Sequence, residues 1–261
     1  MSELLHAFVA TPAYDGKVDC DYSQSLAEAC QAATVFGIRV TACVMGNGAF
    51  IDLARNIFVK MFLDHNKEHP DDKYTHLFFI DSDLKFSSSG FVNLISAKRP
   101  VVAGAYRRRQ EPEDYPVKWT PHAESTEKNG ADSLWVEDDH WVQCSRVPTG
   151  FLCIERSVVE EMAAKAVQME IFGQKGAVPQ LFYTKLTDEN RFQGEDFCWC
   201  DDYVEQYGKQ IEVLADLDFV HSGYKCNWYK YLSKSIEDYK QNDAVNNNES
   251  RKLGDRRKGA K

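Results

Sequence analysis

Short apolar runs alternate with amphipathic stretches along roughly the first hundred residues, and this alternation constrains the fold more than any other feature. Strands linked by crossover helices are typical of an α/β sheet with parallel neighbours. The chain has 261 residues, 43% of them hydrophobic, which suffices for one such domain. We expect strands at Leu4–Ala10, Ile38–Met45, Thr75–Ile80 and Val101–Tyr106, and helices at Tyr22–Phe36, Ile51–Asn66 and Ser88–Ala97.

The pattern changes between about Glu111 and Val147, where prolines and polar residues interrupt it. The sequence predicts a single Rossmann-like α/β domain over residues 1–240, with a mainly parallel central sheet, helices on both faces and a small antiparallel insertion. Residues 241–261 are polar and are expected to form a disordered tail. The remaining expected elements are insertion strands Leu134–Val136 and Trp141–Gln143, strand Phe151–Ile154, helices Ser157–Val167 and Glu195–Gln206, and an amphipathic piece Trp228–Tyr239.

The expected strand Thr75–Ile80 runs directly into Asp81-Ser82-Asp83. Alternate side chains of extended backbone share a face, so both aspartates can point into the crevice beyond the carboxyl end of the strand. Carboxylate oxygens suit Mg²⁺ or Mn²⁺, ions that bind diphosphates. The other interpretation is a turn at a strand end, where Asp and Ser form local hydrogen bonds without any metal.

Four further features are expected at the same edge of the sheet. The loop Thr11–Tyr14 offers an aromatic ring where such sheets receive a base or ribose, although it also fits a simple turn. The helical pair Arg55–Asn56 offers a guanidinium, whose commoner use is a surface ion pair. The acidic pair Glu195–Asp196 opens a helix, where acids also cap the dipole. His221 follows a short strand, and a lone histidine is more often structural than a ligand.

In their order along the chain, these motifs resemble those of nucleotide-sugar glycosyltransferases with the GT-A fold. The resemblance is to small viral and bacterial enzymes in particular, and it spans about residues 4–221. It implies a metal site formed by Asp81, Asp83 and His221, with Mn²⁺ or Mg²⁺ bound; the imidazole favours Mn²⁺. It also implies that the nucleoside-diphosphate sugar is contacted by Thr11, Pro12, Tyr14, Arg55, Asn56, Asp81, Ser82, Arg107 and Gly150.

The resemblance further implies the chemistry. A UDP-sugar is the expected donor, and the bound cation would neutralise the departing diphosphate. Asp196 is the expected base for the acceptor hydroxyl, and Glu195 the expected contact to acceptor or donor sugar. A base at Asp196 means inversion of the anomeric centre, whereas a carboxylate that only binds sugar hydroxyls is compatible with retention. The acceptor stays open among glycans, lipids, proteins and nucleic acids.

A nucleic-acid-directed protein, including a glycosyltransferase acting on modified DNA bases, is the alternative. Arg107–Arg109, the basic residues after Arg251 and three tryptophans favour it. The net charge of −9 argues against a broadly basic binding surface. A binding module that has lost its activity is a third class. It is ranked last because Asp81, Asp83, Asp196 and His221 are all present.

Eight cysteines are scattered through the chain, several of them in apolar runs, as expected of reduced thiols in a cytoplasmic protein. The N-terminus lacks the features of a signal peptide, and no stretch approaches the ~18 apolar residues that cross a bilayer. We therefore expect a soluble protein.

Overall fold

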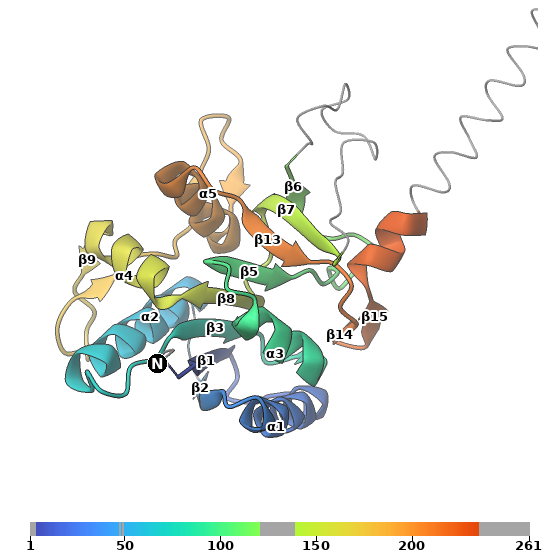
Figure 1. The fold of residues 1–261 in the computed structure, drawn as a ribbon. Coiled ribbons are helices and arrows are strands. Elements are labelled where there is room, and N and C mark those ends of the chain that lie inside the picture. Colours follow the sequence, from blue (N-terminus) through green and yellow to red (C-terminus); the bar gives the residue numbers. More distant parts are fainter. Residues whose placement is uncertain (1–3, 47, 49, 121–138, 235–261) are drawn as a thin grey trace, which may run out of the picture.

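The computed structural model describes residues 4–46, 48, 50–120 and 139–234. An eight-stranded sheet forms the centre of the molecule (Figure 1). The strands lie in the order β2 (Arg39–Gly46), β1 (His6–Ala13), β3 (His76–Ile80), β8 (Phe151–Glu155), β5 (Val101–Gly104), β13 (Ile211–Leu214), β7 (Trp141–Arg146) and β6 (Lys118–Trp119).

The sheet is mixed in its pairings. Strands β2, β1 and β3 are parallel, which confirms the expected parallel framework for these three strands, and β5 is parallel to β13. However, β8 runs antiparallel between β3 and β5, and β7 runs antiparallel between β13 and β6. The expected antiparallel insertion therefore extends the main sheet through β7 and β6.

Helices cover both faces of the sheet, as expected. Successive side chains of a strand point to opposite faces, and β3 shows this with two adjacent phenylalanines. Phe78 stacks on Phe91 of α3, with ring centroids 5.1 Å apart, whereas Phe79 packs edge-on against Phe182 at 5.2 Å. Figure 1 shows α1 (Cys20–Val35) and α3 (Ser88–Ser96) on one side, and α2 (Ile51–Glu68), α4 (Arg156–Lys165) and α5 (Glu195–Tyr207) on the other.

A small three-stranded sheet lies beside the main one. In it β14 (Phe219–His221) pairs antiparallel with both β15 (Tyr224–Cys226) and β4 (Leu84–Lys85). The register places His221 opposite Leu84, the residue after Asp83. Two short hairpins complete the described strands: β9 (Gln168–Met169) with β10 (Val178–Pro179), and β11 (Lys185–Leu186) with β12 (Phe192–Gln193).

Most expected elements are present with shifted ends. The helix α5 ends where Gly208 adopts a left-handed conformation with φ of 59°, and the aromatic piece is helical over 228–234. Strand β13 was not expected, although it pairs with both β5 and β7 inside the sheet. The expected strand Leu134–Val136 and the expected disordered tail 241–261 lie outside the described residues.

Two further expectations concern the cysteines and the helices. All eight cysteines are free thiols in the structure, and five of them are buried. Among the described helices, none combines the length and the apolar character that crossing a bilayer requires.

Candidate functional site

One buried arginine gathers carboxylates from separate parts of the chain. Arg55 lies in the second turn of α2, and its side chain is 2% exposed. Its Nη1 donates to Glu195 Oε1 at 2.7 Å and to Asp196 Oδ1 at 2.6 Å. Its Nη2 donates to Asp81 Oδ1 at 3.3 Å. The end of β3 and the first turn of α5 thus meet at one guanidinium, and we call these four residues the Arg55 cluster.

In the Arg55 cluster, three carboxyl groups surround a single positive charge. Burial disfavours the positive charge on Arg55, but the three carboxylates outweigh burial and raise the pKa of the guanidinium. Burial, and then the neighbouring Asp196, raise the pKa of the Glu195 carboxyl, although Arg55 opposes this shift. Glu195 therefore holds a proton more readily than an exposed glutamate does.

Further hydrogen bonds hold Asp81 in place. Tyr106 donates its hydroxyl to Asp81 Oδ2 at 3.0 Å, and the Gly150 N–H donates to the same hydroxyl at 3.0 Å. The Asp81 N–H donates to the Gly150 carbonyl at 3.0 Å. A Cβ at position 150 would overlap both the Asp81 carboxylate and the Tyr106 hydroxyl. Glycine is therefore required at position 150 because two side chains approach its backbone closely.

The second aspartate of the motif has different partners. The pairing of β4 with β14 brings His221 beside Asp83, with Nε2 and Oδ2 3.5 Å apart. Ser222 donates its hydroxyl to Asp83 Oδ2 at 2.6 Å, and Arg109 Nη2 forms an ion pair with the same oxygen. Asp81 and Asp83 therefore have different bonding partners, although they are only two residues apart.

The tautomer of His221 follows from its hydrogen bonds. Its Nδ1 lies 2.8 Å from the carbonyl oxygen of Arg107, which can only accept, so Nδ1 carries the proton. Arg109 Nε donates to His221 Nε2 at 3.0 Å, so Nε2 presents its lone pair. A backbone carbonyl therefore holds one ring nitrogen of His221, and the other nitrogen faces the Asp83 carboxylate.

A cavity of about 340 Å³ opens beside both aspartates. This volume lies near the lower limit of small-molecule sites, about 300 Å³. We call it the Asp83 cavity. Five of the predicted site residues line it, together with Arg109: Pro12, Tyr14, Asp81, Ser82 and Asp83.

A second cavity, of about 670 Å³, is lined by one member of the Arg55 cluster. Asp196 lines it, and Thr149 donates its hydroxyl to the Asp196 Oδ1 that also accepts from Arg55. We call it the Asp196 cavity. Aromatic and basic side chains form much of its wall, among them Arg146, Arg191, Phe192 and Phe197. Members of the Arg55 cluster therefore line two cavities.

Arg55, a predicted contact to the nucleotide-sugar, instead bonds the acids of the Arg55 cluster. Three further predicted contacts to the nucleotide-sugar also bond within the protein. Thr11 is fully buried, and its hydroxyl forms a hydrogen bond with the hydroxyl of Tyr22. Arg107 is also buried; its Nη2 donates to Glu111 Oε1 at 2.9 Å, and its guanidinium lies 4.7 Å from the centre of the Tyr224 ring. Of the three consecutive arginines, the structure brings Arg109 to the Asp83 cavity.

Asn56, the third such residue, is buried and bonds to backbone. Its Nδ2 donates to the Phe182 carbonyl at 2.7 Å, and its Oδ1 accepts from the N–H groups of Leu181 and Phe182 at 2.8 and 2.9 Å. Asn56→Ala is expected to lower the free energy of unfolding by about 1–3 kcal/mol, because buried backbone groups lose their partners. Urea unfolding measures this loss.

The exposed Gln24, which bonds Glu28 on the surface of α1, is the control, and Gln24→Ala is expected to be nearly neutral. If Asn56→Ala kept its stability and lost nucleotide binding instead, the prediction of a donor contact at this residue would be supported over a structural role.

Two members of the site were not singled out from the sequence. Tyr106 bonds to Asp81, and Ser222 bonds to Asp83. Each lies at a strand end, directly beside or within a segment that the sequence did mark. Hydroxyl-bearing residues next to expected strand ends were the only available indication.

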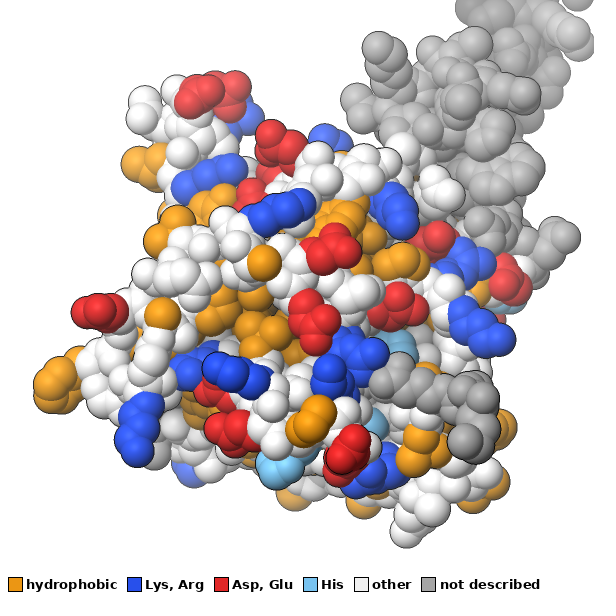
Figure 2. Space-filling view, turned by 60° about the vertical axis from the view of Figure 1, so that its left-hand side comes forward, with side chains coloured by type: hydrophobic (Ala, Val, Ile, Leu, Met, Phe, Trp, Pro, Cys, Tyr) orange, Lys and Arg blue, Asp and Glu red, His pale blue; other side chains and the backbone are white. Residues whose placement is uncertain are grey.

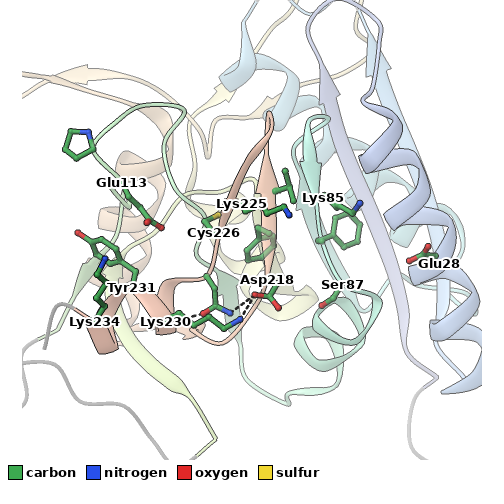
Figure 3. Close-up of a pocket in the computed structure, with 15 residues that line it drawn as sticks. Glu28, Lys85, Ser87, Glu113, Asp218, Lys225, Cys226, Lys230, Tyr231 and Lys234 are labelled. Carbon is green, nitrogen blue, oxygen red and sulfur yellow. Dashed lines mark hydrogen bonds and ion pairs between the residues drawn. The ribbon is translucent and has the colours of Figure 1, made fainter. Parts of the chain in front are cut away.

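A larger cavity, of about 950 Å³, lies along β4, β14 and β15 (Figure 3). Lysines and acids alternate around it, and Lys230 is paired with Asp218 at 2.9 Å. It is lined by none of the predicted site residues, so it lies outside the candidate site.

No protein-family model matches the chain, and no curated protein matches it. Among solved structures it is similar to A197 from STIV, with 15% identity and a TM-score of 0.45 over 83% of this chain and 85% of that one. It is also similar to a glycosyltransferase involved in the glycosylation of the major capsid of PBCV-1, with 7% identity and a TM-score of 0.31 over 60% of this chain and 63% of that one. Both likenesses are too slight to support an argument about function.

Proposed function

We propose that the protein is a metal-dependent glycosyltransferase that moves a sugar from a nucleoside-diphosphate sugar, UDP-sugar being the first candidate, to a hydroxyl acceptor. The observation that carries this proposal is the distance of 3.5 Å between His221 Nε2 and Asp83 Oδ2. Asp83 lines the Asp83 cavity. Two acceptor atoms of different elements, fixed by backbone pairing and facing each other, are suited to one cation.

The donor set fits a divalent ion that keeps other ligands. Within the described residues, no three His, Cys, Asp or Glu side chains form a group that could hold a metal. Mg²⁺ and Mn²⁺ sites that use one or two protein ligands plus phosphate oxygens have this composition, and the imidazole favours Mn²⁺. When bound there, the ion would supply positive charge to the diphosphate that leaves.

The chain's own residues have separate parts in this proposal. Tyr14 and Pro12 form the wall of the Asp83 cavity that would receive the nucleoside, and Ser82 lies between the two aspartates. Asp196, which faces the second cavity, would accept the proton of the acceptor hydroxyl. Arg55 holds this carboxylate in place and balances its charge. Glu195, with its raised pKa, would contact a sugar hydroxyl.

The proposal predicts a specific dependence on Asp83. The melting temperature of the protein is expected to rise with UDP and Mn²⁺ together and much less with either alone, because a ligand stabilises the state that binds it. Asp83→Ala is expected to abolish the joint rise. A nucleotide and nucleotide-sugar panel in a thermal-shift assay also identifies the base.

Asp64→Ala is the matched control, because Asp64 is an exposed aspartate that pairs with Lys60 along α2. It is expected to keep the full response to UDP and Mn²⁺. A joint rise that survives in Asp83→Ala would contradict the proposed metal site.

The nucleic-acid alternative receives less support. Arg107 and Arg108 are paired with acids of their own loop, Glu111 and Asp114. On the face shown in Figure 2, basic and acidic side chains are interspersed. A strand-binding surface needs a continuous basic groove, which these pairings work against.

A further inference from the structure

Arg109 lies between the two side chains that we propose as metal ligands. Its Nη2 is paired with Asp83 Oδ2, and its Nε donates to His221 Nε2 at 3.0 Å. One guanidinium therefore engages both acceptor atoms, which are themselves 3.5 Å apart. It directs positive charge and hydrogen-bond donors to the lone pairs that a divalent ion would use.

The neighbouring arginines show that this contact is particular to Arg109. Arg107 is buried and pairs with Glu111, and Arg108 pairs with Asp114 at 3.0 Å on the surface. The side chain of Arg109 is 57% exposed, so packing does not fix it, whereas that of Asp83 is 17% exposed. The carboxylate is held in place, and the arginine is the partner that is free to move.

We propose that Arg109 is an internal cation of this site, exchanged for the divalent ion, and that the displaced guanidinium then binds the diphosphate of the donor. This inference rests on the proposed function. Arg109 lines the Asp83 cavity, so it is already beside the space where a diphosphate would bind. A guanidinium presents several donors in one plane and suits phosphate oxygens.

The exchange has opposite consequences for two ligands. A metal ion that binds alone must displace Arg109, and the displaced guanidinium then has no phosphate to contact. Arg109 therefore weakens the binding of metal alone. A diphosphate with metal meets the freed guanidinium, so Arg109 strengthens the binding of the pair. A residue that merely stabilised the fold would affect both ligands in the same direction.

The test is Arg109→Ala in the full chain, with the fold checked by circular dichroism. Mn²⁺ binding is measured from the electron paramagnetic resonance signal of the free ion, and UDP binding at saturating Mn²⁺ is measured by calorimetry. We expect Mn²⁺ alone to bind about three- to fivefold more tightly, the range of a partly exposed ion pair. We expect UDP with Mn²⁺ to bind at least about tenfold more weakly, as for a lost charge-assisted hydrogen bond.

Arg108→Ala is the matched control, because it removes the same charge one residue earlier, from a pair with Asp114. It is expected to leave the affinity for Mn²⁺ unchanged. An equal gain in both variants would show an effect of net charge alone and would overturn the exchange.

The outcomes separate this inference from the proposed function. If the parent chain binds UDP with Mn²⁺ but Arg109→Ala binds Mn²⁺ no more tightly, the exchange is wrong and the metal site stands. If the two affinities change in opposite directions but no sugar is transferred from any donor, the exchange stands and the proposed activity is wrong. If neither the parent chain nor Arg109→Ala binds Mn²⁺, with or without UDP, both are wrong.

Discussion

Arg55→Ala is expected to lower the free energy of unfolding by about 3 kcal/mol at neutral pH, because it leaves three partly buried acids without their shared, fully buried partner. Arg55 donates to Asp81, which follows β3, and to Glu195 and Asp196 of α5. Without the guanidinium, the negative charges of these neighbouring carboxylates repel one another. Urea unfolding of the variant and the parent measures the difference.

This loss is expected to depend on pH. The pKa of Glu195 is raised above its ordinary value of 4.5 by burial and by Asp196, and Arg55 opposes the shift, so the variant raises that pKa further. An acid with a raised pKa in the folded state costs stability where it is ionised, and this cost disappears as the pH falls toward the unfolded value. The deficit of the variant relative to the parent should therefore be smaller at about pH 5.5 than at about pH 7.5.

Arg39→Ala is the control for a simple loss of an ion pair. Arg39 is half-exposed and pairs with Asp72 on the surface, so little stability should be lost with it. A loss below about 1 kcal/mol in Arg55→Ala would put Arg55 in the class of surface pairs and contradict a buried, shared cation.

Asp196→Asn is expected to lower the rate of sugar transfer by about 100- to 10,000-fold, the usual contribution of a general base. The amide keeps the size of the carboxylate and an oxygen for Thr149 and Arg55, but it cannot accept the acceptor's proton. Binding of UDP with Mn²⁺ should remain close to normal, because those contacts belong to the Asp83 cavity. Turnover assays with the donor identified by thermal shift measure the rate.

Asp202→Asn tests the same chemical change six residues later on α5, where the carboxylate bonds to the hydroxyl of Tyr183. This variant should transfer sugar at the parent rate. Unchanged turnover in Asp196→Asn would withdraw the assignment of the base.

The sequence predicts the positions of those site residues that lie at the ends of strands and helices. An apolar strand that runs into Asp81 predicted where that aspartate lies, and acids before a helical pattern predicted the start of α5 with Glu195 and Asp196. These inferences use local periodicity and helix-end chemistry, which a sequence displays directly. They located the candidate site at the edge of the sheet.

The partners of each side chain were not predictable in the same way. Arg55 and Asn56 are neighbours on α2, yet one binds carboxylates 140 residues away and the other binds the backbone of Phe182. Which residue takes which partner depends on how α2 rotates against the segments packed on it, and periodicity does not encode this. The pair Asp83 and His221 likewise depends on the pairing of β4 with β14, two very short strands.

Because β8 runs antiparallel to β3, the segment that enters β8, and not the one that leaves it, lies beside the candidate site. Ligand contacts in open α/β sheets usually come from segments that leave a strand. Here the Gly150 end of β8 lies beside the end of β3, so the segment that enters β8 reaches Asp81. Under the proposed function, lengthening the connection before Phe151 is therefore expected to alter substrate choice, whereas an insertion after Glu155 would fall at the opposite end of the strand and is expected to leave recognition intact.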